Sequence, residues 1–173
     1  HYLYRRMTVP IALVLTVLMI LYASFVMGGQ SECITESLAP GQSLLGLNFG
    51  YDFQYVADLF ERLNRESLQC YSRLLMIWDN LFPVLYGSMY MAWLSVLYRR
   101  KSKIHQWPVN LYPLIPVVLD WAENYLENGL VSQYLAHASL NPSAIETASL
   151  INQIKWSASG LNYLLILAGL AIG

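Results

Sequence analysis

The segment LIPVVLDWAENYLENGL, residues 114–130, carries Asp120, Glu123 and Glu127 within an otherwise largely apolar run. Asp120, Glu123 and Asn124 are spaced i, i+3 and i+4, so a helix would place them on one face. Such carboxylates are costly to bury unless they are paired, protonated or bound to a cation. The segment therefore predicts a polar site inside an apolar protein.

Two further segments carry polar residues that would lie at the same depth in a membrane as those of residues 114–130. INQIKW carries Asn152 and Lys155 at i and i+3, and IWDNLFP carries Asp79, which is seven residues before Tyr86. The predicted binding residues are Asp79, Tyr86, Asp120, Glu123, Asn124, Asn152 and Lys155. This set holds three carboxylates and one ammonium group. Either Lys155 pairs with one acid and the network only fixes helix register, or a proton, metal ion or cationic ligand balances the surplus charge.

Hydropathy predicts the helices that carry these residues. Of the 173 residues, 56% are hydrophobic and 12% are charged, about half the charged fraction of a soluble domain. Apolar runs of a length that can span a bilayer lie at about residues 9–27, 74–97, 108–126 and 150–172. The first run is longer than the apolar core of a typical signal peptide. We expect one all-α domain over residues 1–173, an integral membrane four-helix bundle.

Basic residues predict the orientation of this bundle. Arg5 and Arg6 precede the first run, and Arg99, Arg100, Lys101 and Lys103 follow the second. The positive-inside rule makes that side cytoplasmic. We therefore expect a protein of the bacterial inner membrane with both termini on the cytoplasmic side.

The outer loop, residues 28–73, begins with turn-like GGQSE, APGQS and NFG sequences. From about residue 52 to 70, Phe53, Val56, Phe60 and Leu63 recur at helical spacing opposite charged residues. This pattern predicts an amphipathic helix, which either covers the outer mouth of the bundle or rests on the membrane surface.

Cys33 and Cys70 are the two cysteines of the chain, and both fall in this outer loop. A disulfide between them is expected if the outer space is oxidising, and two free thiols are expected otherwise. The chain has no C-x-x-C motif, which argues against disulfide-transfer chemistry.

The order FGYDFQYVADLFERLN, WDNLFPVLYG, LDWAENYL and IKW resembles a group of small bacterial four-helix membrane proteins. The resemblance covers about residues 48–157 and rests on an Asp in the second helix, D-x-x-E-N in the third and Lys in the fourth. It implies the four-helix architecture and the polar residue set, and it implies no particular activity or cofactor.

Several function classes lack their sequence signals. The chain has no H-E-x-x-H, G-x-S-x-G or phosphate-binding loop motif, and none of its three histidines lies in a predicted span. A net charge of −1 gives no nucleic-acid signal.

Three functions remain open. The first is a module that binds or transports a lipid-like or cationic small ligand in a pocket open to the outer side. The second is a membrane enzyme in which Asp79, Asp120 and Glu123 act as acid and base or hold a divalent ion, with Lys155 stabilising developing negative charge. The third is an accessory subunit of a larger membrane complex. Expected partners are therefore membrane lipids, a small amphipathic ligand or ion, or other membrane subunits.

Overall fold

The computed structural model describes residues 2–99 and 108–172, and all regular secondary structure in these two stretches is helical, as predicted. Arg100, Lys101 and Lys103 of the predicted basic segment lie outside the described residues. The α-helices are α1 (Tyr2–Arg6), α2 (Val9–Leu21), α3 (Gly28–Thr35), α4 (Phe53–Arg62), α5 (Arg65–Arg73), α6 (Asn80–Leu97), α7 (Leu114–His137) and α8 (Pro142–Ile172).

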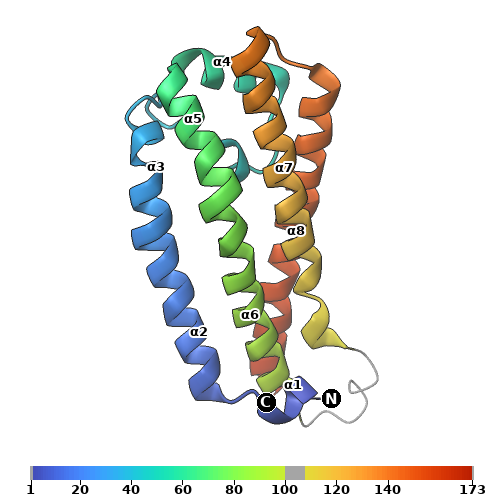
Figure 1. Ribbon diagram of the computed structural model, residues 1–173. Helices are drawn as coiled ribbons and strands as arrows, with labels where there is room; N and C mark the ends of the chain where they lie inside the picture. Colours follow the sequence, from blue (N-terminus) through green and yellow to red (C-terminus); the bar gives the residue numbers. More distant parts are fainter. Residues whose placement is uncertain (1, 100–107, 173) are drawn as a thin grey trace.

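The described residues form four long helical rods. A π-helical turn, Tyr22–Met27, joins α2 to α3 in the first rod, and another, Leu74–Asp79, joins α5 to α6 in the second. The third rod is α7 and the fourth is α8. Figure 1 shows the rods side by side, with α1 and the last turn of α8 at the same end. This arrangement agrees with the prediction that both ends of the chain lie on one side.

Among the described residues, one helix is long and apolar enough to cross a membrane, the first rod from Val9 to Thr35. A signal sequence or the core helix of a soluble protein meets the same criteria of length and composition. For the other three rods, a position in the membrane stays a prediction.

The rods extend beyond the predicted spans at the end away from the termini. The first rod continues through Gly28 and Gly29 to Thr35, so the predicted GGQSE turn is wrong. Glycine weakens a helix by about 1 kcal/mol, but the extra turns place Ile34 in the core with no exposed surface. The α7 helix starts at Leu114, later than predicted, and continues past residue 126 to His137. Hydropathy located the apolar part of each helix and missed these turns at the end of the bundle away from the termini, which we call the outer end.

The predicted amphipathic helix over residues 52–70 is two helices, α4 and α5. The backbone is extended at Leu63, and the Asn64 side chain accepts a hydrogen bond from the Ser67 amide to begin α5. This cap satisfies an amide at the helix start and stabilises a new helix direction. In α4, Val56 and Phe60 are fully buried, whereas Phe53 is 44% exposed.

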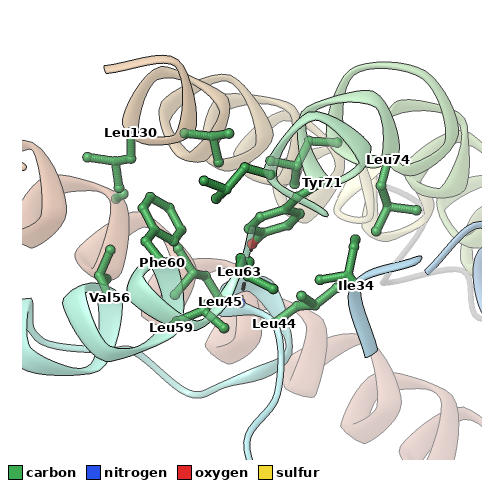
Figure 2. Packing of buried hydrophobic residues seen from close by; sticks show 14 of the residues in the cluster. Ile34, Leu44, Leu45, Val56, Leu59, Phe60, Leu63, Tyr71, Leu74 and Leu130 are labelled. Carbon is green, nitrogen blue, oxygen red and sulfur yellow. Dashed lines mark hydrogen bonds between the residues drawn. The ribbon is translucent and has the colours of Figure 1, made fainter. Parts of the chain in front are cut away.

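The largest hydrophobic core lies at the outer end, under α4. It joins Phe60 of α4, Tyr71 of α5, Ile34 of α3 and Leu130 of α7 around Leu45, which lies in the loop between α3 and α4 (Figure 2). The described part of α2, by contrast, buries one residue, Ala12. The outer ends of the rods are thus held by a packed core, and α2 exposes most of its apolar side chains.

The structure joins Cys33 of α3 to Cys70 of α5 in a disulfide, with their Cα atoms 6.5 Å apart. That separation is in the usual range for disulfides. The bond connects the end of the first rod to the start of the second, as predicted for an oxidising outer space.

Candidate functional site

The predicted site residues come from three rods and lie just below the outer core. Asp120, Glu123 and Asn124 lie on one buried face of α7, and Asn152 and Lys155 lie on the facing side of α8. Glu123 and Asn152 have no exposed surface, and Lys155 is 8% exposed. Asp79 ends the π-helical turn of the second rod and is half-buried.

Lys155 pairs with two of the carboxylates. Its Nζ atom lies 3.4 Å from Asp120 Oδ1 and forms a second ion pair with Glu123 Oε2. The predicted contact between Lys155 and at least one acid of α7 is therefore present. It has a simple cause: the i, i+3 spacing turns both acids toward α8.

The neighbouring polar groups extend this contact on both sides. The Tyr86 hydroxyl lies 2.9 Å from Asp120 Oδ2, and Asn152 Nδ2 donates to Glu123 Oε1 at 2.5 Å. Asp79 is close enough to Asp120 for the two carboxylates to interact electrostatically. Two amide atoms, Asn124 Nδ2 and Asn152 Oδ1, are buried with no hydrogen-bond partner in the structure. All seven predicted residues therefore belong to one region of the structure, and their role in binding stays a prediction.

The predicted set omitted Glu127, which is fully buried. The Tyr71 hydroxyl donates to Glu127 Oε2 at 2.7 Å, and the Tyr51 hydroxyl donates to Oε1 at 3.2 Å. Glu127 follows Glu123 by four residues, so the spacing alone could have included it. The omission followed from ending the third helix at residue 126.

Burial next to Glu127 raises the pKa of the Tyr51 hydroxyl far above its ordinary value. Burial and the same carboxyl group also raise the pKa of Tyr71. Both phenols therefore keep their protons and act as hydrogen-bond donors to Glu127.

A loop for which the sequence predicted turns but no role at the site covers this region. A methyl group added to Gly46 would lie 3.5 Å from Glu123 Oε1 and 3.9 Å from Lys155 Nζ, so the loop backbone touches the charged groups. The Gly46 carbonyl oxygen accepts hydrogen bonds from Lys155 Nζ at 3.4 Å and from Trp156 Nε1 at 3.1 Å. The loop, residues 44–50, lies directly over the acids, where the prediction had placed an opening beneath the amphipathic helix.

We define the polar cluster as these eight residues: Asp79, Tyr86, Asp120, Glu123, Asn124, Glu127, Asn152 and Lys155. It contains four carboxyl groups and one ammonium group. At least part of this surplus must be balanced by protons or by a bound cation, because uncompensated buried charges are strongly unfavourable. Within residues 2–99 and 108–172, no group of three or more His, Cys, Asp and Glu side chains has the arrangement of a metal site.

Comparisons with protein-family models, with curated proteins and with solved structures find no match to this chain.

Proposed function

We propose that the chain is a four-span membrane protein whose polar cluster binds a small cationic or lipid-like ligand from the outer side of the membrane. The observation that carries the binding proposal is the charge surplus of the cluster. The membrane proposal rests on the surface of the four rods.

All four rods turn large apolar side chains outward. Val14, Leu81, Val118 and Leu164, one from each rod, are 58%, 48%, 58% and 62% exposed. Soluble monomers rarely expose continuous apolar surfaces of this extent. Lipid chains would remove these side chains from water.

Charged residues within the rods support the same placement. The first rod carries no charged residue before Glu32. In the fourth rod, Lys155 is the one charged residue after Glu146. In the second and third rods, the charged residues of the corresponding stretches are Asp79, Asp120, Glu123 and Glu127. All five of these interior charges belong to the polar cluster, so a band around the molecule carries no other charge.

The length of this band fits a bilayer. From Trp78 to Leu97 the second rod rises about 29 Å, at 1.5 Å per residue, close to the roughly 30 Å of a hydrocarbon core. Trp78, Trp121 and Trp156 accompany the polar cluster on their three rods, as expected of aromatic residues at an interface. The cluster therefore lies near one edge of the proposed membrane region.

Two features support the proposed orientation. Arg5, Arg6 and Arg99 lie at the end opposite the cluster, and the positive-inside rule assigns that end to the cytoplasm. The disulfide lies at the cluster end, where an oxidising compartment would maintain it. The proposed binding site then faces the outside of the cell.

Within the cluster, Asp79 is the best candidate for contact with a ligand. The two ion pairs of the described residues join Lys155 to Asp120 and Glu123, so Asp79 forms no ion pair of its own among these residues. Asp79 is also half-buried, whereas Asp120, Glu123 and Glu127 are buried. A ligand ammonium group would supply a positive charge in direct contact with this carboxylate.

Asp79→Asn tests the proposal, because it removes one charge and keeps the size of the side chain. The protein in lipid nanodiscs should bind hexylammonium, measured by calorimetry, and should not bind neutral hexanol. We expect Asp79→Asn to weaken hexylammonium binding at least about tenfold, or roughly 1.4 kcal/mol, with little change in melting temperature. The control is Asp58→Asn, which changes an exposed carboxylate of α4. Wild-type affinity in Asp79→Asn, or equal binding of hexanol, would refute the proposal.

Acid–base catalysis is the second candidate function. The contact between the Tyr86 hydroxyl, the Asp120 carboxylate and the Lys155 ammonium group favours it, because these groups can exchange a proton directly.

A further inference from the structure

A cavity separate from the polar cluster lies between α3 and α5. Its volume is about 490 Å³, and the Cys33–Cys70 disulfide forms part of its wall. None of the eight cluster residues lines it. Most of its lining residues are exposed, so the cavity is open to the surface, and its volume lies within the range of small-molecule sites.

The part of the cavity nearest the proposed membrane region carries unused hydrogen-bond donors. Trp78 lines the cavity, and its Nε1 atom is buried without a hydrogen-bond partner. Arg73 lies about a turn and a half further out on the second rod and also lines the cavity. Among the described residues, Arg73 forms no ion pair. A buried indole N–H and an unpaired guanidinium group together favour a ligand with acceptor oxygens, of which phosphate suits Arg best.

The outer part of the cavity carries carboxylates in place of these donors. Glu66 of α5 lies about 10 Å further out than Arg73 along the helix axis, and Glu32 of α3 lines the same cavity. Neither glutamate forms an ion pair among the described residues. A ligand that meets both ends would carry a phosphate toward the membrane and a cation away from it.

The order of groups along the first and second rods favours a lipid rather than a soluble metabolite as the ligand. Below Arg73, Leu74 gives the cavity an apolar lining residue. On the first rod, Phe25 lies about one turn below the cavity-lining Gly29 and is 75% exposed. Acyl chains could follow this apolar surface, and the ester carbonyl groups of a lipid would then lie at the level of the Trp78 N–H group.

We propose that this cavity binds the headgroup of a phospholipid of the phosphoethanolamine type. Arg73 contacts the phosphate, Trp78 donates to an ester or phosphate oxygen, and Glu66 and Glu32 accept hydrogen bonds from the primary ammonium group. This inference rests on the membrane placement proposed above and is independent of ligand binding by the polar cluster.

The experiment measures the melting temperature of the full chain in detergent with and without added lipid. At a lipid concentration about 100 times Kd, phosphatidylethanolamine should raise the melting temperature of the wild type by about 5–10 °C. Phosphatidylcholine should have a smaller effect because its quaternary ammonium group has no N–H to donate. Phosphatidylglycerol should also have a smaller effect because it offers no cation to the two glutamates.

The variants separate the two ends of the cavity. Arg73→Gln and Trp78→Phe should each reduce the response to phosphatidylethanolamine, and Glu66→Gln should abolish the preference for it over phosphatidylcholine. The matched control is Arg65→Gln, which removes an exposed arginine of the same helix that does not line the cavity. Arg73→Gln should retain hexylammonium binding, so failure of this proposal is distinguishable from failure of the cluster proposal.

Three results would overturn the inference. Equal stabilisation by the three lipids would show that the headgroup is not recognised. A wild-type response to phosphatidylethanolamine in Arg73→Gln would show that Arg73 does not contact the phosphate. Equal stabilisation by soluble phosphoethanolamine would show that the acyl chains contribute nothing and that the ligand is not a lipid.

Discussion

The Lys155 ammonium group lies between two carboxylates, at a depth where a single charge would be costly. Its contacts with Asp120 and Glu123 make the polar cluster a structural element of the interface between α7 and α8. This role is compatible with ligand binding, because the ion pairs use one positive charge and leave Asp79 and Glu127 outside them. Stability and binding should therefore respond to different residues of the cluster.

Lys155→Met should destabilise the protein by roughly 3–5 kcal/mol, because it leaves buried acids without their cation. Thermal or denaturant unfolding in detergent measures the effect. The control is Ile154→Met, which changes an adjacent residue that is 47% exposed and should have little effect. Equal stability of the two variants would mean that the acids are already protonated and do not need Lys155.

Tyr71→Phe removes the hydroxyl group that donates to Glu127 Oε2. The carboxyl group keeps Tyr51 as a donor but loses its shorter hydrogen bond, so we expect a loss of about 1–3 kcal/mol in unfolding free energy. Tyr125→Phe is the matched control because Tyr125 is 72% exposed. A result for Tyr71→Phe within error of this control would show that Glu127 does not depend on that contact.

At the scale of elements, the loop from Leu44 to Gly50 positions the backbone over the acids. Leu45 anchors it in the outer core with no exposed surface, and Gly50 adopts a left-handed conformation with φ of 82°. A methyl group on Gly50 would lie 2.5 Å from Gln153 Nε2, so an alanine at this position would require the Gln153 side chain of α8 to move. The loop contains one 3-10 turn, Leu45–Leu47, and hydrogen bonds from Lys155 and Trp156 to Gly46 attach it to α8.

Gly50→Ala should therefore displace the Gln153 side chain and destabilise the protein by more than the roughly 1–2 kcal/mol of a left-handed alanine. Gly41→Ala supplies the comparison, because Gly41 has a similar φ of 80° but has open space around its Cβ position. Unfolding free energies of both variants give the difference due to contact with Gln153. If Gly41→Ala is as destabilising as Gly50→Ala, the close approach to α8 contributes nothing.

Removing the disulfide with Cys33→Ser and Cys70→Ser together should lower stability by up to about 4 kcal/mol, the chain-entropy value for a loop of this length. The bond closes 37 residues between the first and second rods. Wild-type protein treated with a reductant should show the same loss. No change in either sample would indicate that the outer core alone holds α3 against α5.

Much of the element order was predictable because long apolar runs and i, i+3 polar pairs are local signals. They located the helical segments and brought Lys155 to Asp120 and Glu123. The extent of α7 was not predictable from hydropathy, since its outer turns contain charged Glu127 and are stabilised by packing with Tyr71 and Tyr51. The loop over the cluster was missed because its role depends on backbone contacts of Gly46 with α8, more than a hundred residues away in sequence. Contacts of that kind leave no periodic pattern.

At the scale of the whole molecule, the two ends of the bundle differ in how they are held. The outer end has a large packed core, a disulfide and the polar cluster, whereas the described residues of the inner end form smaller hydrophobic clusters around Tyr90 and Leu94. Lipid around the rods would complete the packing of the inner part. Both proposed binding sites lie toward the end with the disulfide and the larger hydrophobic core.

The four-span arrangement and its orientation predict which residues a membrane-impermeant maleimide can reach in intact cells. Asp58→Cys on α4 and Glu146→Cys near the start of α8 should be labelled from outside, because both are exposed at the disulfide end. Arg5→Cys and Arg99→Cys should be labelled only after the cells are permeabilised. The native cysteines are bonded to each other and should give no background. Labelling of Arg99→Cys from outside, with Arg5→Cys protected, would mean that only the first rod crosses the membrane. The reverse pattern at all four positions would mean that the basic end faces outward, and the cluster would then lie near the cytoplasmic surface.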